Sequence, residues 1–412
     1  MLQPVGVGHK SLADYTHLVG RPLIEEIRTL SEEMQGLKVL HLSATAFGGG
    51  VSEILYTLVP LMRDVGLDAD WQVIIGREEF YNATKLMHNA LQGNPQDLSP
   101  EEWDIYEKYN EINAGQLSGD WDVIIVHDPQ PLAVRQHVPE KSKNWIWRCH
   151  IDLSTPNPAT VERLTPLIAE YDLGSVWHLR QYVPSGLNGE GPIHIVPPAI
   201  DPLSPKNMAL SPEDAAFVCD QFGVDVDRPL MCQVSRFDPW KDPHGVIDAY
   251  RIVKEELPEV QLALVGSMAT DDPEGWEFFN STLEYAGGDP DIKILNNLNQ
   301  VGSIEVNAFQ SQAEVVIQKS TREGFGLTVS EALWKARPFI GGDVGGIPLQ
   351  VQDGETGFLV SSPEECAARS LRILREPELG KQLGRAGKEH VRQHFLTPRL
   401  LRDWLGIFSE LK

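Results

Sequence analysis

The sequence predicts an α/β protein of two domains, each organised around a doubly wound parallel β-sheet. Short apolar segments that suit buried strands alternate along the chain with segments of helical periodicity, which indicates sheets covered by helices on both faces. This alternation stops once, at the proline-rich segment 197–205, and then restarts. A chain of 412 residues also exceeds the size of a typical single core, so two domains of about 200 residues each are expected.

The first expected domain covers residues 1–199. Residues 1–36 are expected to be helical, because apolar residues such as Ile24 and Ile27 recur at helical spacing. Glycines 48–50 separate the first expected strand from the helix that follows it. Strands are expected at 38–43, 69–75, 123–127, 145–149, 174–178 and 193–196, with helices in the polar segment 77–118.

The second expected domain covers residues 206–396. Its strands are expected at 230–234, 261–265, 292–295, 315–318, 339–341 and 358–360, with helices at 244–256 and 303–311. A last helix is expected at residues 397–412. It begins with Thr397 and Pro398, a capping residue followed by the proline that suits a first helical turn.

The composition of the chain excludes some classes of binding partner and indicates the cellular compartment. The net charge is −24, from 59 acidic and 35 basic residues, which disfavours nucleic acids and anionic membranes as partners. No apolar segment is long enough to cross a bilayer as a helix, and the N-terminus lacks a charged-then-apolar signal, so a cytoplasmic protein is expected. The four cysteines lack the pairing of metal sites and are expected to be reduced core thiols.

The segment 323–331 is the most informative, because two glutamates eight residues apart flank a Gly-Phe-Gly turn. Helical periodicity follows the turn, so its amides are expected at a helix N-terminus, where phosphate groups bind. Carboxylates do not bind phosphate, so Glu323 and Glu331 are expected to contact hydroxyls of a sugar and a ribose. The structural alternative makes Glu331 a solvated helix residue and Glu323 a charge favoured by the helix dipole. The turn between them favours the functional interpretation.

This Glu-x7-Glu segment resembles the signature of retaining family 4 glycosyltransferases, which have the GT-B architecture of two facing Rossmann-like domains. Segments 44–53 (ATAFGGGVSE) and 200–207 (IDPLSPKN) resemble trehalose synthases of the glycosyltransferring type, and trehalose phosphorylases share much of the pattern. Most family members carry Pro-Ser before the first glutamate, where this chain has QKSTRE at 318–323. The resemblance spans nearly the whole chain. It implies that helix 397–412 crosses back onto the N-terminal domain.

A cationic loop, residues 235–243, follows the first strand of the second domain. Ligands of doubly wound sheets bind beyond the carboxyl ends of strands, and Arg236 and Lys241 lie at such an end. Two fixed cations suit a diphosphate, whose charge grows as its bond to the sugar breaks. The alternative is that they are surface cations paired with Asp238 and Asp242. The resemblance favours the functional interpretation, because the family carries an Arg/Lys pair there.

Glycine turns are expected to complete the donor site. Gly49 and Gly50 belong to a turn whose amides could approach the donor or could merely connect a strand to a helix. The base is expected beside Gly266, Asn297 and Leu298, where backbone groups read it, so uracil, adenine and guanine are not distinguished. The full set of expected donor-binding residues is Gly49, Gly50, Arg236, Lys241, Gly266, Asn297, Leu298, Glu323, Gly324, Phe325, Gly326, Leu327 and Glu331.

The acceptor site is expected in the first domain. The resemblance implies a histidine near the acceptor and the anomeric carbon, and His150 has that position in this chain. From the residues alone, a satisfied structural histidine is an equal alternative. Asp152 is expected to accept a hydrogen bond from an acceptor hydroxyl, and His178 to line the pocket. The expected catalytic residues are Arg236, Lys241, Glu323 and His150.

The resemblance implies a reversible hexosyl transfer with retention, from a nucleoside-diphosphate glucose to free glucose, giving α,α-trehalose. GT-B enzymes typically use no bound metal, and no Asp-x-Asp motif falls in a strand-end loop, so neither a metal nor another bound cofactor is expected. The donor is UDP-, ADP- or GDP-glucose. Two alternatives stay open: a phosphate-dependent trehalose phosphorylase and a non-catalytic sugar-nucleotide binding protein. The expected partners are small molecules, and the sequence does not decide between a monomer and a homodimer.

Overall fold

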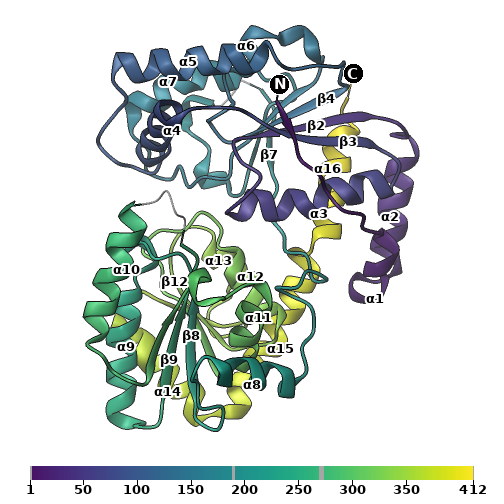
Figure 1. Ribbon diagram of the computed structural model, residues 1–412. Helices are drawn as coiled ribbons and strands as arrows, with labels where there is room; N and C mark the ends of the chain where they lie inside the picture. Colours follow the sequence, from purple (N-terminus) through teal and green to yellow (C-terminus); the bar gives the residue numbers. More distant parts are fainter. Residues whose placement is uncertain (1, 188–190, 269–272, 412) are drawn as a thin grey trace. The chain divides into compact units, whose positions relative to one another are not determined.

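The chain forms two α/β units (Figure 1). The first unit comprises residues 1–199 and 397–412, and the second comprises residues 200–396. The computed structural model describes residues 2–187, 191–268 and 273–411. Each unit has its own β-sheet and its own cluster of buried apolar side chains.

The sheet of the first unit has seven strands among the described residues, in the spatial order β1-β3-β2-β4-β5-β6-β7. All neighbouring strands run parallel except β1 and β3. Strands β4 and β5 are buried along their whole length, as expected for a sheet covered on both faces. The strands are β1 (Gln3–Pro4), β2 (Lys38–Ser43), β3 (Asp68–Val73), β4 (Val123–His127), β5 (Trp145–Arg148), β6 (Ser175–Trp177) and β7 (Ile193–Ile195).

Strand β1 corrects the prediction that residues 1–36 are helical. It pairs antiparallel with β3 and ends the sheet on that side. A strand of two residues is too short to show periodicity in the sequence, and its proline suits an edge strand. Helices α1 (Thr16–Val19) and α2 (Arg21–Glu32) follow, and Ile24 and Ile27 are buried on α2.

Helices cover both faces of the first sheet (Figure 1). One face packs against α4, α5 and α7, whose apolar side chains belong to the same buried cluster as the strands. The other face lies against α3 and the C-terminal helix α16, which also packs on α2. The further helices of this unit are α3 (Gly50–Asp64), α4 (Glu78–Leu91), α5 (Pro100–Ala114), α6 (Val134–His137), α7 (Pro158–Ala169) and α16 (Thr397–Phe408).

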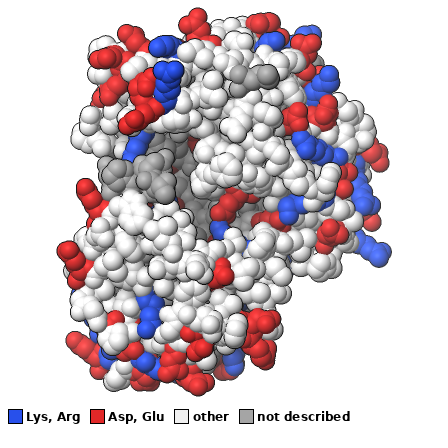
Figure 2. Space-filling model, viewed as in Figure 1, with Lys and Arg blue, Asp and Glu red and all other residues white. Residues whose placement is uncertain are grey.

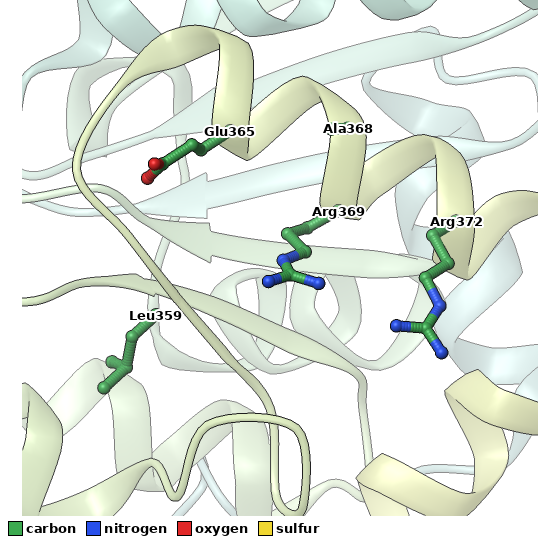
Figure 3. Close-up of a pocket in the computed structure, with 5 residues that line it drawn as sticks. All are labelled: Leu359, Glu365, Ala368, Arg369 and Arg372. Atoms are coloured by element: carbon green, nitrogen blue, oxygen red, sulfur yellow. The ribbon is translucent and has the colours of Figure 1, made fainter.

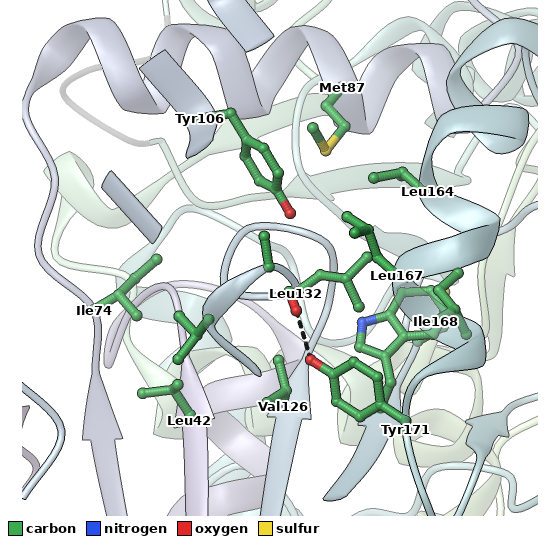
Figure 4. Close-up of a cluster of buried hydrophobic side chains, with 14 of the residues drawn as sticks. Leu42, Ile74, Met87, Tyr106, Val126, Leu132, Leu164, Leu167, Ile168 and Tyr171 are labelled. Atoms are coloured by element: carbon green, nitrogen blue, oxygen red, sulfur yellow. Dashed lines mark hydrogen bonds between the residues drawn. The ribbon is translucent and has the colours of Figure 1, made fainter. Parts of the chain in front are cut away.

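Large aromatic side chains fill the core between the first sheet and helices α4 to α7 (Figure 4). Tyr106 and Tyr171 are buried there, and the hydroxyl of Tyr171 donates to the carbonyl oxygen of Leu132 over 2.7 Å. The tryptophans Trp145, Trp147 and Trp177 of strands β5 and β6 are also fully buried. Because each aromatic ring removes a large apolar area from water, this layer fixes the strands from which the polar loops emerge.

The sheet of the second unit has six strands among the described residues, all parallel, in the order β10-β9-β8-β11-β12-β13. The strands are β8 (Leu230–Val234), β9 (Gln261–Val265), β10 (Ile292–Leu295), β11 (Val315–Gln318), β12 (Phe339–Gly342) and β13 (Phe358–Val360). The helices are α8 (Pro212–Gln221), α9 (Pro243–Glu256), α10 (Pro273–Ala286), α11 (Ser303–Gln312), α12 (Leu327–Trp334), α13 (Ile347–Gln350), α14 (Pro363–Arg375) and α15 (Pro377–His394).

The cysteines are buried free thiols, as predicted: Cys149, Cys219, Cys232 and Cys366. Across the described ranges, no helix is long and apolar enough to span a membrane.

Candidate active site

The strand order of the second unit brings two loops to the same edge of the sheet. Strand β8 lies between β9 and β11, so the chain leaves β8 toward one side of the sheet and later returns to the other side. Ligands of open α/β sheets bind at such a switch point, beyond the carboxyl ends of the strands. The loop after β8 carries Arg236 and Lys241, and the loop after β11 carries Glu323.

These two loops are joined by direct contacts. The ammonium nitrogen of Lys241 lies 2.7 Å from Oε2 of Glu323, and both side chains are largely buried. The backbone nitrogen of Thr321 donates to the carbonyl oxygen of Trp240 over 2.8 Å. The structure therefore brings together two of the predicted catalytic residues, a cation and a carboxylate.

Arg236 and Lys241 differ in their surroundings. The side chain of Arg236 is 67% exposed and lies 3.4 Å from Asp238, which matches the alternative of a paired surface cation. Lys241 has only 15% of its side chain exposed and pairs with Glu323, so the alternative pairing with Asp242 is wrong for this lysine. Asp242 pairs with a different lysine.

That lysine is Lys319, which sequence reasoning did not assign to the site. It is 5% exposed, follows strand β11, and forms an ion pair with Asp242. Asp242 has a left-handed backbone with φ of 49° and also caps α9, because its carboxylate accepts from the backbone nitrogen of Gly245. The sequence did contain a sign of this lysine's role, because residues 318–323 lack the Pro-Ser pair that most family members carry before the first glutamate.

The Gly-Phe-Gly turn precedes helix α12, as predicted. Gly326 has φ of 78°, which favours glycine, and a Cβ there would lie only 3.1 Å from the side chain of Glu323. Gly346 packs against the turn so closely that a Cβ would lie 2.7 Å from the carbonyl oxygen of Gly324. The backbone nitrogen of Gly346 also donates to the carbonyl oxygen of Glu323 over 3.3 Å. The turn therefore has one fixed conformation, and Phe325 and Leu327 are held with it.

Glu331 is buried on α12, with 1% exposure, so the alternative of a solvated helix residue is wrong. Its Oε1 lies 3.5 Å from the ammonium nitrogen of Lys206. Lys335 donates to the carbonyl oxygen of Glu331 over 3.1 Å and to Oδ1 of Asn207 over 3.2 Å. Burial lowers the pKa of Lys335 to about 7, whereas the negative charge of Glu331 raises it. The segment 200–207 thus contributes Lys206, which contacts Glu331, and Asn207, which contacts Lys335, and sequence reasoning assigned neither side chain to the site.

The predicted base-binding residues lie at the ends of β9 and β10. A Cβ on Gly266 would lie 2.6 Å from the carbonyl oxygen of Ser235, so glycine lets the cationic loop approach this strand end. The side-chain oxygen of Asn297 accepts from the backbone nitrogen of Met268 over 2.7 Å, which ties the two strand ends together. Leu298 is 62% exposed at this edge. Residues 269–272, which follow, lie outside the described residues.

The glycine turn of the first unit connects β2 to α3. Gly48 and Gly49 have φ of 68° and 115°, so both need glycine for conformation. No described atom lies within 4 Å of a Cβ built on either residue, so the turn does not need glycine for packing. Helix α3 begins at Gly50, and Phe47 beside the turn is 76% exposed.

His150 follows β5 and contacts two other histidines. Its Nε2 lies 2.9 Å from Nδ1 of His127, and its Nδ1 lies 3.4 Å from Nε2 of His178. Burial, together with the nearby positive charge of Arg148, lowers the pKa of His150 and of His178 well below the usual value. Two predicted acceptor-site residues are therefore in contact, and both are neutral at pH 7.

Carboxylates fix the loop after β5. Asp128, with φ of 63°, accepts a hydrogen bond from the backbone nitrogen of His150 over 2.7 Å. Burial raises the pKa of Asp128 to about 7, although the bond to His150 and the charge of Arg148 oppose this. Asp152 is 4% exposed and accepts from the backbone nitrogen of Ser154 over 2.8 Å, so one of its oxygens holds the loop.

Other surfaces of the described residues do not resemble this site. A cavity of about 450 Å³ is lined by Leu359, Glu365, Ala368, Arg369 and Arg372 (Figure 3), none of which belongs to the predicted set. On the face shown in Figure 2, acidic side chains are scattered among fewer basic ones. Within the described ranges, no group of three or more His, Cys, Asp or Glu residues is arranged to hold a metal ion.

Comparison with known proteins places the chain in a family. A family model described as trehalose synthase, N-terminal domain, matches residues 41–184, and one described as glycosyl transferases group 1 matches residues 218–390. A trehalose synthase of Rubrobacter xylanophilus is 57% identical over 100% of this chain and 99% of its own length. The chain belongs to the trehalose synthase family of glycosyltransferases.

Two other relatives mark the breadth of the similarity. A trehalose synthase of Thermococcus litoralis is 46% identical over 97% of both chains. A trehalose phosphorylase of Pleurotus pulmonarius is 27% identical over 96% of this chain but only 60% of its own length. The phosphorylase is thus the more distant relative.

Solved structures share the fold. A sucrose-phosphate synthase from Thermosynechococcus elongatus matches with a TM-score of 0.69 and 19% identity, over 91% of this chain and 99% of that one. The Anabaena protein HepE, solved with UDP and glucose, matches with a TM-score of 0.66 and 15% identity, over 91% of this chain and 100% of that one. The two parallel-sheet units are those of the GT-B architecture, as predicted.

Proposed function

We propose that this protein forms α,α-trehalose by transferring glucose, with retention, from a nucleoside-diphosphate glucose to free glucose. The observation that carries the proposal is the 57% identity to a trehalose synthase over the whole chain. The donor class is supported by a neighbour of the same fold that was solved with UDP and glucose. UDP-, ADP- and GDP-glucose are all candidate donors, because we expect backbone groups to bind the base, and the side chains therefore do not distinguish these donors.

The second unit supplies the charges that this reaction needs. As the bond between the anomeric carbon and the diphosphate breaks, negative charge develops on the leaving oxygen. We assign Arg236 and Lys241 to that charge, and the amides of 324–327 to the phosphate groups. The 2.7 Å contact between Lys241 and Glu323 supports this assignment, because a cation for the phosphate and a carboxylate for sugar hydroxyls lie side by side.

Glu331 is assigned to the ribose. Its carboxylate is buried, and its Oε1 lies 3.5 Å from the ammonium nitrogen of Lys206. An ionised carboxylate accepts hydrogen bonds strongly, as a pair of ribose hydroxyls requires. The base lies beside Gly266, Asn297 and Leu298 in this assignment.

The first unit supplies the acceptor contacts. We assign His150, Asp152 and His178 to the glucose that attacks. In the proposed step, the acceptor oxygen bonds to the anomeric carbon on the face from which the diphosphate departs. The hydroxyl proton moves to the leaving phosphate oxygen, so neither a covalent enzyme intermediate nor a side-chain base is required.

The test uses the reverse reaction. Trehalose is incubated with the purified protein and, separately, with UDP, ADP, GDP or inorganic phosphate, and the products are identified. We expect a nucleoside-diphosphate glucose and free glucose with at least one nucleotide. Glucose phosphate formed only with inorganic phosphate would instead establish the phosphorylase, which the distant Pleurotus relative represents. Nucleotide binding without any product would indicate a non-catalytic binding protein.

A further inference from the structure

Four histidines of the first unit form a continuous row. Nδ1 of His41 lies 3.0 Å from Nε2 of His127, and Nδ1 of His127 lies 2.9 Å from Nε2 of His150. Nδ1 of His150 in turn lies 3.4 Å from Nε2 of His178. Ring centroids of neighbours are 5.2–5.3 Å apart. Each contact joins an Nδ1 to the Nε2 of the next ring, so the row has one repeating geometry.

The register of the parallel strands explains why these rings share one face of the sheet. His41 is aligned with the residue two positions before His127, and His127 with the residue two positions before His150. The residues two positions before His150 and before His178 are also aligned with each other. Side chains two residues apart along a strand point to the same face. The four histidines, which lie on or just after β2, β4, β5 and β6, therefore lie on one face of the sheet.

Met62 of helix α3 closes one end of the row. Its Sδ lies 3.5 Å from Nε2 of His41, and both residues have 0% exposure. Trp404 of α16 meets the His41 ring edge-on, with centroids 6.3 Å apart. This end therefore lies inside the core, and its last polar contact is with a sulfur atom.

Each imidazole of the row is neutral at pH 7. Burial lowers the pKa of His41 to about 3 and the pKa of the other three well below the usual value. Arg148, which is aligned with His127 on the same face, acts in the same direction on those three. Asp128 is bonded to the backbone of His150, not to a ring nitrogen. A neutral imidazole has one N–H, so each contact in the row needs one donor and one acceptor.

The sulfur fixes the direction of these hydrogen bonds. A thioether accepts but cannot donate, so a hydrogen bond between Met62 and His41 requires the proton on Nε2 of His41. Nδ1 of His41 then accepts from Nε2–H of His127. By the same step Nδ1 of His127 accepts from Nε2–H of His150. The opposite direction would place a nitrogen lone pair against the sulfur.

We propose that Met62, His41 and His127 are positioning residues that hold His150 as its neutral Nε2–H tautomer, with Nδ1 accepting from His178. The proposal extends the proposed function, in which His150 contacts the acceptor glucose. Both ring nitrogens of His150 are then engaged within the row, so His150 can contact the acceptor glucose only through the carbon atoms of its ring and cannot take the acceptor's proton. The proton is left for the phosphate oxygen, as the proposed step requires.

Two other uses of the row fit the structure less well. A metal site would need three or more ligands around one point, and no such group exists among the described residues. A path for protons would need an outlet, but the His41 end is closed by Met62 within the core. A fixed set of tautomers requires neither a central point nor an outlet.

The test is nitrogen-15 NMR of the histidine rings in the full-length protein at pH 7, without substrates. We expect neutral Nε2–H signals for His41, His127, His150 and His178, each with Nδ1 as an acceptor. A cationic His150, or one protonated on Nδ1, overturns the proposal whatever the activity. Expected tautomers in a protein without transferase activity would instead leave the row standing and overturn the proposed function.

Met62→Leu removes the sulfur and conserves the side-chain volume, so little effect on folding is expected. We expect a mixture of tautomers at His41 that extends to His150, and a lower kcat with an unchanged KM for the donor. The matched control is Met87→Leu, because Met87 is also fully buried in this unit but lies in the cluster on the other face of the sheet. Wild-type tautomers in Met62→Leu would contradict the role of the sulfur.

A pair of variants at His127 tests the row at its centre. His127→Gln keeps one acceptor and one donor in its amide, whereas His127→Leu keeps neither. We expect His127→Leu to mix the tautomers of His150 and lower kcat by up to about 100-fold, the scale of a misplaced catalytic group. His127→Gln should restore the Nε2–H tautomer and most of kcat. Equal effects of both variants on tautomer and kcat would mean that His127 acts through packing alone.

Discussion

The carboxyl edges of the two sheets are built from opposite kinds of interaction. In the second unit, charged groups meet in ion pairs, as in the pairs of Lys241 with Glu323 and Lys319 with Asp242. In the first unit, the four histidines of the row are neutral, and His41, His127 and His178 are buried. Their contacts are hydrogen bonds between imidazoles. An edge that stabilises a developing diphosphate charge needs permanent charges, whereas an edge that orients an uncharged sugar does not. The difference therefore matches the donor and acceptor roles that we propose.

The largest expected effect concerns the carboxyl edge of the second sheet, with its ion pairs, which we call the charged edge. Lys241→Ala and Arg236→Ala should each lower kcat by about 100-fold or more, because each removes a fixed cation from a developing negative charge. Only Lys241→Ala should also lower the free energy of unfolding, since Lys241 is buried against Glu323 whereas Arg236 is exposed. Steady-state kinetics and urea unfolding separate the two effects. Lys381→Ala, in an exposed ion pair, is the control, and near-wild-type kcat in either site variant removes that residue from the site.

A second change tests whether ion pairs hold the charged edge in place. Lys319→Met removes the partner of Asp242. Removing one partner of a fully buried ion pair costs about 3–5 kcal/mol, and we expect the free energy of unfolding to fall by no more than this amount. Adding Asp242→Asn should recover part of that loss, because the remaining group is then uncharged. Chemical unfolding of both single variants and the double variant gives the coupling energy. Strictly additive losses would mean that the two side chains do not interact.

The histidine row of the first unit, which we call the neutral edge, should make the free energy of unfolding depend on pH. Because burial lowers the histidine pKa values, the unfolded chain binds protons below about pH 6.5 that the folded row does not. The free energy of unfolding is therefore expected to fall by about 1.4 kcal/mol per pH unit for each histidine as the pH drops below 6.5. Asp128 opposes this trend, because its raised pKa of about 7 makes the folded state bind a proton between about pH 7 and 4.

Urea unfolding between pH 7.5 and 5 measures this slope, and His127→Gln provides the comparison. The variant has one buried imidazole fewer, so its slope should be shallower by about 1.4 kcal/mol per pH unit. Identical slopes for the two proteins would mean that His127 is protonated in the folded state.

The smallest expected effect distinguishes the two glutamates of the charged edge. Glu331→Gln should raise the Kd for free nucleoside diphosphate about tenfold, since one hydrogen bond to a charged group contributes about 1.5 kcal/mol. Glu323→Gln should lower kcat and leave that Kd nearly unchanged, because its assigned partner is the sugar. Calorimetric titration with the nucleotide decides between them, and equal changes in Kd would refute the division of roles.

Local patterns in the sequence predicted most of the strands and the loops that follow them. Strands 230–234, 261–265, 292–295 and 315–318 have the predicted bounds, because three or four apolar residues in a short segment between polar turns leave little choice of end. The turn before α12 was predicted for a similar reason, since glycines and helical periodicity are both local signals. Strand β1 was missed because two residues carry no pattern.

Residue types at strand ends were therefore determined by the sequence alone: Arg236 and Lys241 after one strand, Glu323 after another, and His150 after a third. Which of them touch was decided only by the tertiary structure. His41 lies in the middle of a strand, so its position gave no sign of a functional role. Lys319 pairs with Asp242, which is 77 residues away in the chain, and Lys206 contacts Glu331, which is also distant in the sequence. Such pairings depend on the spatial order and register of parallel strands. That order is set by packing between distant segments, which no local pattern of residues encodes.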